Sequence, residues 1–110
     1  MEIKSEVRNN ITIITPVGRV DTATAKEFEE GVSQHLKENS VLVISFAEIN
    51  YISSAGLRVI LMVGKKQAAS RGKLGLIDMH EKIHEVFKMS GFDKIIKIYD
   101  NFETASAALA

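Results

Sequence analysis

The sequence predicts a single α/β domain built on one mixed β-sheet. The chain has 110 residues, the length of one compact domain with its own hydrophobic core. Short apolar segments of strand length alternate with longer segments whose apolar residues recur at helical spacing. Two strand segments stand together at the beginning, so the order is ββαβαβαβα, with about five strands and about four helices. We therefore expect residues 1–110 to form one domain.

Charge and composition narrow the class of function. Lys and Arg number 14 together, as do Asp and Glu, so the formal net charge is zero and no bulk field attracts nucleic acid or an anionic membrane. The chain has no cysteine, which excludes disulfides, thiolate nucleophiles and Cys-based zinc sites. Its first residues contain no signal-peptide core, and its longest apolar run, residues 59–63, is too short to span a bilayer. We expect a cytoplasmic protein without a cofactor.

The first two strands are expected to form a hairpin. Residues 3–8 alternate between apolar and polar, as in an edge strand with one solvated face. Asn9-Asn10 tolerates the positive φ of a tight turn, and residues 11–15 form the return strand, which Pro16 and Gly18 end.

Alternating helices and strands follow the hairpin. The side-chain oxygens of Asp21 and Thr22 can cap a first helix that runs to about Glu38. Residues 41–46 are continuously apolar, which is typical of a central strand covered on both faces. After a short connection, a second helix is expected from about Ser54 to Ser70.

The last third of the chain repeats this alternation. Residues 74–77 form a short buried strand, and Asp78 is expected to cap a third helix that Gly91 ends. Residues 95–99 predict the last strand, and residues 102–109 a terminal helix.

One motif suggests a metal site. His80-Glu81-Lys82-Ile83-His84 matches the H-E-x-x-H signature, which places two imidazoles on one face of a helix. A structural interpretation is favoured, because Asp78 and Glu81 match a capping box and no third ligand follows at the metzincin spacing. A chain this short also has little room for a substrate cleft beyond its core. We expect no metal site, no catalytic residue and no enzyme activity.

The segment Ser53-Ser54-Ala55-Gly56-Leu57 is the expected functional centre. Serine is a preferred N-cap, so the simplest interpretation is that it caps the following helix. Apolar residues surround the beginning of this helix, more than one core-facing stripe needs. Some of Val59, Met62 and Val63 are therefore expected at the surface, as part of a partner-binding patch. The free N–H groups of a helix N-terminus favour anions, so a hydroxyl there is suited to a phosphorylation switch.

At this point the sequence resembles the STAS family, and within it the bacterial anti-sigma-factor antagonists. The resemblance covers essentially the whole chain and includes the hairpin, Gly18-Arg19-Val20-Asp21, residues 41–46, and Ser54 in a Ser-[SAT]-Gly-Leu core. It implies a regulatory protein that, when unphosphorylated, binds an anti-sigma factor serine kinase and so frees the sigma factor. The kinase phosphorylates the antagonist, and a PP2C-type phosphatase restores it.

The resemblance also implies site residues. The family's acceptor serine precedes [SAT]-Gly-Leu, which corresponds to Ser54. Many antagonists have aspartate directly before the acceptor, whereas this chain has Ser53, which is the alternative acceptor. The partner-binding residues expected beside the acceptor are Asp21, Thr22, Ser53, Ala55, Gly56, Leu57, Arg58, Val59 and Met62.

Two alternatives stay open at this point. Other STAS proteins are constitutive subunits of lipid-transport complexes, in which Ser54 would only cap a helix that docks permanently on the transporter. The oligomeric state is either a monomer or a weak dimer, because an apolar helix surface could serve a second copy as well as another partner.

Overall fold

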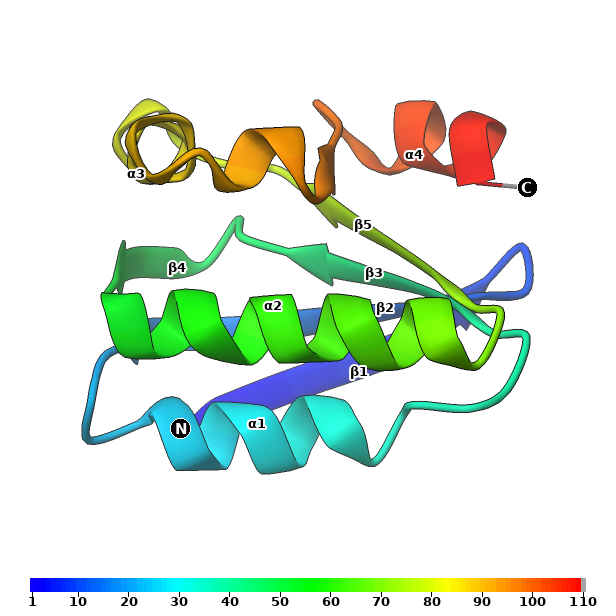
Figure 1. The fold of residues 1–110 in the computed structure, drawn as a ribbon, viewed down its shortest axis with the longest axis horizontal. Helices are drawn as coiled ribbons and strands as arrows, with labels where there is room; N and C mark the ends of the chain where they lie inside the picture. Colours follow the sequence, from blue (N-terminus) through cyan, green and yellow to red (C-terminus); the bar gives the residue numbers. More distant parts are fainter. Residues whose placement is uncertain (110) are drawn as a thin grey trace.

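The computed structural model describes residues 1–109 and confirms the predicted fold class, a single α/β domain with a mixed sheet; Ala110 of the expected domain lies outside the described residues. The sheet has six strands in the order β1-β2-β3-β5-β6, with β4 paired to β2 (Figure 1). The elements are β1 (Glu2–Arg8), β2 (Ile11–Val20), α1 (Ala25–Ser33), β3 (Val41–Ser45), β4 (Ile49–Ile52), α2 (Ser54–Ala69), β5 (Lys73–Ile77), α3 (Glu81–Ser90), the 3-10 helix η1 (Phe92–Lys94), β6 (Lys97–Ile98) and α4 (Phe102–Leu109).

The opening hairpin forms as predicted. β1 pairs antiparallel with β2, and Arg8 lies opposite Ile11 across a two-residue turn. Asn9 and Asn10 have φ angles of 54° and 64°, so both adopt the left-handed conformation that the turn requires. Asparagine tolerates this conformation better than most residues.

β2 changes its parallel partner halfway along its length. Residues 11–14 pair with β3, whereas residues 18–20 pair with β4. Pro16 lies between these two sets of pairs, where its missing N–H costs no ladder hydrogen bond to either strand. The prediction that Pro16 and Gly18 end the strand was therefore wrong, because β2 continues to Val20.

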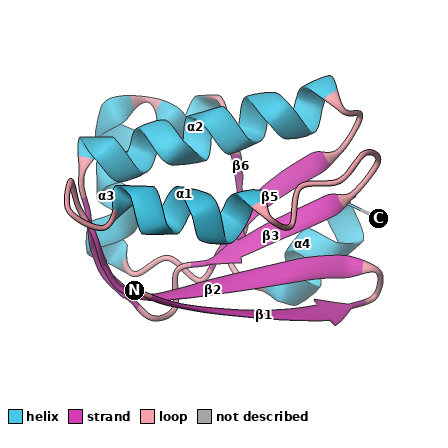
Figure 2. Ribbon diagram, turned by 90° about the horizontal axis from the view of Figure 1, so that it is seen from below, coloured by secondary structure: helices cyan, strands magenta, loops and turns pink. Residues whose placement is uncertain are grey.

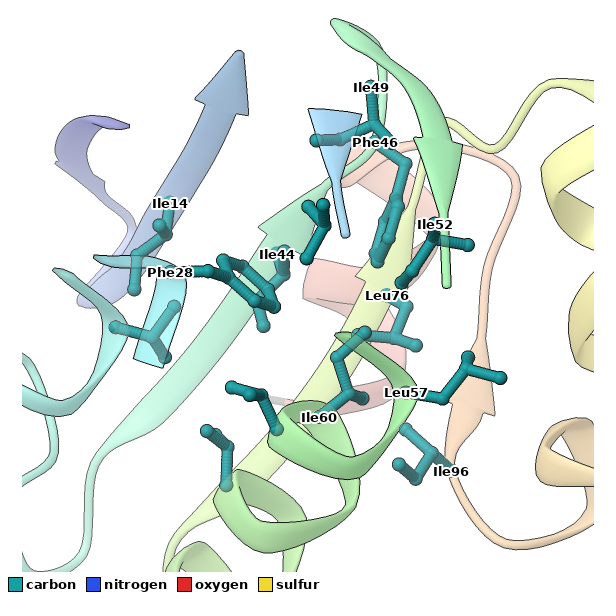
Figure 3. Close-up of a cluster of buried hydrophobic side chains, with 14 of the residues drawn as sticks. Ile14, Phe28, Ile44, Phe46, Ile49, Ile52, Leu57, Ile60, Leu76 and Ile96 are labelled. Carbon is teal, nitrogen blue, oxygen red and sulfur yellow. The ribbon is translucent and has the colours of Figure 1, made fainter. Parts of the chain in front are cut away.

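The two faces of the sheet bury different clusters. One face packs against α1, α2 and α3, and Figure 2 shows α1 and α2 side by side over it. The core on that face includes Ile14, Phe28, Ile44, Ile60 and Leu76 (Figure 3). The opposite face packs against α4, since the neighbouring strand residues point the other way. α2 is thus enclosed by the sheet and by its neighbouring helix.

Several predicted boundaries were wrong. α1 covers only Ala25–Ser33, and residues 34–38 form turns and irregular backbone. The last strand is reduced to Lys97–Ile98, and Ile95, which was expected in it, is 65% exposed. The second and fourth helices lie where they were predicted. The third helix ends at Gly91, whose φ of 79° matches the left-handed cap that glycine favours.

The expected capping box of α3 does not form. Asp78 lies two residues before the N-cap residue, His80, and has a φ of 60°. Its carboxylate accepts a hydrogen bond of 3.0 Å from the Ser45 hydroxyl at the end of β3. Asp78 therefore connects two strand ends rather than capping the helix. Of the helices in residues 1–109, none combines the length and apolar character needed to cross a bilayer.

Candidate functional site

The site lies where β2 and β4 end side by side. Val20 pairs with Ile52 at the ends of these parallel strands. The Ser53 N–H donates a hydrogen bond of 2.8 Å to the Val20 carbonyl oxygen. The loop after β2, which begins at Asp21, and the beginning of α2 at Ser54 are therefore neighbours. The structure brings together the two sequence segments that were expected to form the site.

The two serines of the motif have different environments. Ser53 is the N-cap residue of α2, and its carbonyl oxygen accepts a hydrogen bond of 3.0 Å from the Leu57 N–H. Its hydroxyl oxygen is buried and has no hydrogen-bond partner among the described residues, so it provides no side-chain cap. Ser54 is the first residue of α2 and is exposed. Of the two hydroxyls, only that of Ser54 lies on an open surface next to the helix N-terminus.

Gly56 allows the first turn of α2 to lie directly on the strand ends. A Cβ atom added to Gly56 would lie 2.6 Å from Val20 Cγ1 and 2.8 Å from Ile52 Cγ1. These distances are shorter than a carbon–carbon contact, so only glycine fits without a shift. Gly56 and Leu57 are buried. We conclude that these two residues position the serines and that neither offers a side chain to a partner.

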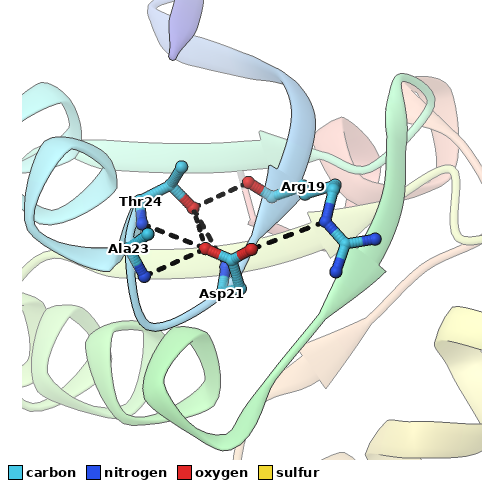
Figure 4. A network of polar contacts seen from close by, with 4 residues as sticks. All are labelled: Arg19, Asp21, Ala23 and Thr24. Atoms are coloured by element: carbon cyan, nitrogen blue, oxygen red, sulfur yellow. Dashed lines mark hydrogen bonds and ion pairs between the residues drawn. The ribbon is translucent and has the colours of Figure 1, made fainter.

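Asp21 organises the loop before α1. Its Oδ1 accepts hydrogen bonds from the Ala23 N–H at 3.0 Å and the Thr24 N–H at 3.1 Å (Figure 4). The Thr24 hydroxyl donates to the Arg19 carbonyl oxygen at 2.8 Å and accepts from the Asp21 N–H at 2.9 Å. The prediction that Asp21 and Thr22 cap α1 was wrong, because Thr24 is the N-cap residue and Asp21 instead holds the turn that precedes the helix.

The Asp21 carboxylate is held in its charged form. Partial burial raises the pKa of this carboxyl, but hydrogen bonds from Thr24, Arg19 and Ala23 outweigh this effect and leave the pKa below its ordinary value. The Arg19 Nε lies 3.4 Å from Asp21 Oδ2, and the Asp21 side chain is 30% exposed. A fixed negative charge therefore lies at the surface beside the beginning of α2.

Arg19 and Tyr51 form a pair that sequence reasoning missed. They lie opposite each other in the β2–β4 pairing, and the Arg19 guanidinium carbon lies 4.5 Å from the centre of the Tyr51 ring. Tyr51 is 42% exposed, and exposed Tyr and Arg side chains are frequent energetic centres of interfaces. The sequence did not predict this pair, because residues 49–52 were expected to be a connection rather than a strand paired with β2.

A groove of about 440 Å³ lies between α1 and α2. It contains five of the predicted partner-binding residues together with three residues of α1: Thr22, Ala25, Lys26, Glu29, Ala55, Arg58, Val59 and Met62. The expected apolar patch is smaller than predicted. Val59 is only 7% exposed and Val63 is fully buried, because α2 packs against both the sheet and the neighbouring α1. Met62 is half-buried and remains at the surface.

The H-E-x-x-H motif lies at the beginning of α3. His80 is the N-cap residue, and its Nε2 lies 3.2 Å from the Ala47 carbonyl oxygen. Within residues 1–109, no cluster of three or more His, Asp or Glu side chains is arranged to hold a metal ion.

Comparison with known proteins gives a family match along nearly the whole chain. Residues 2–105 match the family model described as STAS domain. BtrV of Bordetella bronchiseptica, named as a candidate anti-sigma factor antagonist, is 34% identical over 109 residues, which cover 98% of this chain and 94% of BtrV. The anti-sigma F factor antagonist of Paenibacillus polymyxa is 28% identical over 105 residues, which cover 92% of this chain and 88% of that protein.

Solved structures share the fold. A candidate anti-sigma factor antagonist from Thermotoga maritima has a TM-score of 0.89 at 23% identity, covering 97% of this chain and 93% of that one. The phosphorylated form of the Bacillus cell fate determinant SpoIIAA has a TM-score of 0.70 at 17% identity, covering 97% of both chains. A sulfate transporter family protein from Wolinella succinogenes has a TM-score of 0.78 at 16% identity, covering 94% of this chain and 88% of that one. Proteins of different kinds thus share this fold.

Proposed function

Because this chain belongs to the STAS domain family, we propose that it acts as an anti-sigma factor antagonist, a regulatory binding protein rather than an enzyme. The relatives named as antagonists match almost their whole length, which supports a shared role for the whole domain. The observation that carries the proposal is the position of Ser54. Its exposed hydroxyl stands at the N-terminus of α2, directly beside the Asp21 loop.

The proposed partner is an anti-sigma factor that is also a serine kinase. The unphosphorylated chain binds it through the surface around Ser54, which includes Asp21, Thr22, Arg58 and Met62. These side chains are exposed or half-buried around the strand ends and the groove between α1 and α2. Binding sequesters the anti-sigma factor and frees the sigma factor. A PP2C-type phosphatase reverses the phosphorylation that ends the interaction.

Phosphorylation of Ser54 acts on the interface more than on the fold. A phosphoserine adds about −1.5 to −2 charge at neutral pH. At a helix N-terminus this anion gains roughly 0.3–1 kcal/mol, so the domain stays folded. Covered by a partner without a counterion, the same charge costs on the order of 3–5 kcal/mol, which is roughly a hundred- to several-thousand-fold in affinity.

Burial supports Ser54 over Ser53 as the acceptor. The Ser53 oxygen is buried, so a kinase would reach it only after the beginning of α2 had moved. Ser54 needs no such movement. The Bacillus protein SpoIIAA, which shares this fold, is known in a phosphorylated form. This precedent supports a phosphorylated state for the present chain.

The test is mass spectrometry after incubation with ATP and each anti-sigma kinase of the same organism. We expect one phosphate, on Ser54, in the parent and in a Ser53→Ala variant, and none in a Ser54→Ala variant. Phosphate on another residue, or none with any of these kinases, would contradict the switch. A permanent complex with a transporter, combined with the absence of phosphate, would instead identify the chain as a constitutive STAS subunit.

A further inference from the structure

β1 presents an unpaired edge of the sheet. It is the terminal strand in the sheet order, and no described strand lies beyond it (Figure 2). All of its seven residues except the half-buried Ile3 are exposed, and Val7 is 71% exposed. A strand edge of this length, with free backbone groups, is a template for pairing with another strand.

The hairpin determines which backbone groups face this edge. Arg8 and Ile11 close a two-residue turn, so they form a hydrogen-bonded pair of the antiparallel ladder. Hydrogen-bonded and non-hydrogen-bonded pairs then alternate along the strands. The even-numbered residues of β1 therefore direct their N–H and C=O groups to β2. The odd-numbered residues Ile3, Ser5 and Val7 direct theirs outward.

The charges of β1 are self-complementary about Ser5. The even-numbered positions are Glu2, Lys4, Glu6 and Arg8, all on the face away from α1. When a second copy of β1 is laid antiparallel with Ser5 opposite Ser5, Glu2 faces Arg8 and Lys4 faces Glu6, each twice. We propose that β1 pairs in this register with β1 of a second copy, which joins two sheets into one symmetric dimer.

Neighbouring registers are excluded by charge or by hydrogen bonding. A shift of two residues places Glu2 opposite Glu6 and Lys4 opposite Lys4, or Lys4 opposite Arg8 and Glu6 opposite Glu6. Like charges directly opposite each other destabilise a strand pair. A shift of one residue sets outward-facing odd residues against even residues whose backbone groups already bond β2. Of these neighbouring registers, only the Ser5-centred one satisfies both conditions. A shift of four residues also sets opposite charges against each other, but it leaves only three residues of each strand paired.

The same register covers the exposed apolar side chain of β1. Val7 lies opposite Ile3 of the second copy, on the face that packs against α1. Ile3 is half-buried and packed onto the core, so it offers Val7 an apolar neighbour. The ion pairs that Lys4 forms with Glu48 and Arg8 forms with Glu6 are solvent-exposed, and exposed pairs are readily exchanged. The inference does not depend on the proposed function, since Ser54 and Asp21 lie outside β1.

A cross-linking experiment tests the register. The chain has no cysteine, so a Ser5→Cys variant carries a single thiol. Opposite residues in a hydrogen-bonded pair have Cα atoms about 5.5 Å apart, within the range of a disulfide. In the same dimer the two Val7 positions lie about 13 Å apart along the strands. We expect oxidation to cross-link the Ser5→Cys variant roughly tenfold faster or more than a Val7→Cys control. Equal rates in the two variants would overturn the proposal.

Charge reversal tests the same proposal without a covalent bond. Lys4→Glu places a carboxylate opposite each Glu6, and we expect roughly tenfold weaker dimerisation or more in analytical ultracentrifugation. The double variant Lys4→Glu/Glu6→Lys restores opposite charges and the parent's net charge, and should dimerise as the parent does. Lys66→Glu on the exposed surface of α2 is the matched control and should have no effect. A parent that stays monomeric at all concentrations, or a double variant as weak as the single one, would overturn the proposal.

Discussion

The N–H of Ser53 lies 2.8 Å from the carbonyl oxygen of Val20 and donates a hydrogen bond to it. This bond continues the β2–β4 pairing by one residue beyond Ile52. It fixes the beginning of α2 to the beginning of the Asp21 loop, although the two segments are far apart in the sequence. This bond therefore holds the two segments of the proposed interface side by side.

Replacing Ser53 by alanine tests the state of the buried hydroxyl. An N-cap serine normally contributes about 1 kcal/mol to helix stability through its side chain. The Ser53 hydroxyl makes no such bond, so we expect Ser53→Ala to leave the free energy of unfolding unchanged or to raise it by up to about 1 kcal/mol. Urea unfolding measures the difference. Thr24→Val, which removes a bonded hydroxyl, should cost about 1 kcal/mol.

Two glycines of α2, Gly56 and Gly64, allow a substitution and its control to be compared in the same helix. Gly56→Ala forces a methyl group against Val20 and Ile52, and we expect it to lower the free energy of unfolding by about 1–3 kcal/mol. Gly64→Ala meets no atom nearer than 3.7 Å and removes a residue with poor helix propensity. It should raise the free energy of unfolding by up to about 1 kcal/mol. Thermal and urea unfolding measure both differences. Equal changes in the free energy of unfolding of the two variants would contradict this interpretation.

Asp21 should make stability depend on pH in the acidic range. Its pKa is lower in the folded state than its ordinary value of 3.8, so ionised Asp21 stabilises the fold. This contribution is fully present above pH 3.8 and is lost as the pH falls through the lower folded-state pKa. Asp21→Asn has no such contribution. We expect the difference in unfolding free energy between parent and variant to shrink between neutral pH and pH 2, as followed by urea titrations; a constant difference would show that the charge has no effect.

Ser54→Asp should separate folding from binding. A carboxylate at the first position of α2 is favourable to the helix, so stability should rise by about 0.3–1 kcal/mol or stay unchanged. In the proposed complex the same charge is covered, and the affinity for the anti-sigma factor should fall by roughly a hundredfold or more. Calorimetric titration measures this loss. Ser54→Asn, which is similar in size but uncharged, is the control and should retain binding; equal affinity for the two variants would contradict the electrostatic mechanism.

The sequence predicts the order of elements well but not β4. Hydrophobic periodicity was sufficient for the hairpin, for α2 and for α4, because each has a clear period or turn signal. Residues 49–52 contain only four residues with two apolar ends, which is too short for a periodic signal. Their pairing depends on β2 continuing beyond Pro16, which is a tertiary event. Missing this strand also concealed the pair of Arg19 and Tyr51.

The two segments of the proposed site lie together as predicted, but the apolar surface expected around them is smaller. The apolar residues around the beginning of α2 were interpreted as a patch for a partner. In the structure Val59 and Val63 are buried, because α2 packs against both the sheet and the neighbouring α1. The prediction for Asp78 was also wrong. This residue was expected to cap α3, but its carboxylate instead accepts a hydrogen bond from the Ser45 hydroxyl. The sequence pattern shows which interactions a side chain can make, but the tertiary packing determines which partner it contacts.

The change of partner along β2 has a dynamic consequence. Residues 18–20 pair only with β4, and β4 pairs only with β2, so this two-stranded part lacks the support that both neighbours give to residues 11–14. An isolated pair of strands opens at a smaller free-energy cost than the centre of a sheet. The amide of Ser53 should therefore exchange its hydrogen with solvent sooner than the amides of Ile14 and Val43. The end of the domain that carries Ser54 can adapt to a partner by local opening while the remaining sheet stays closed.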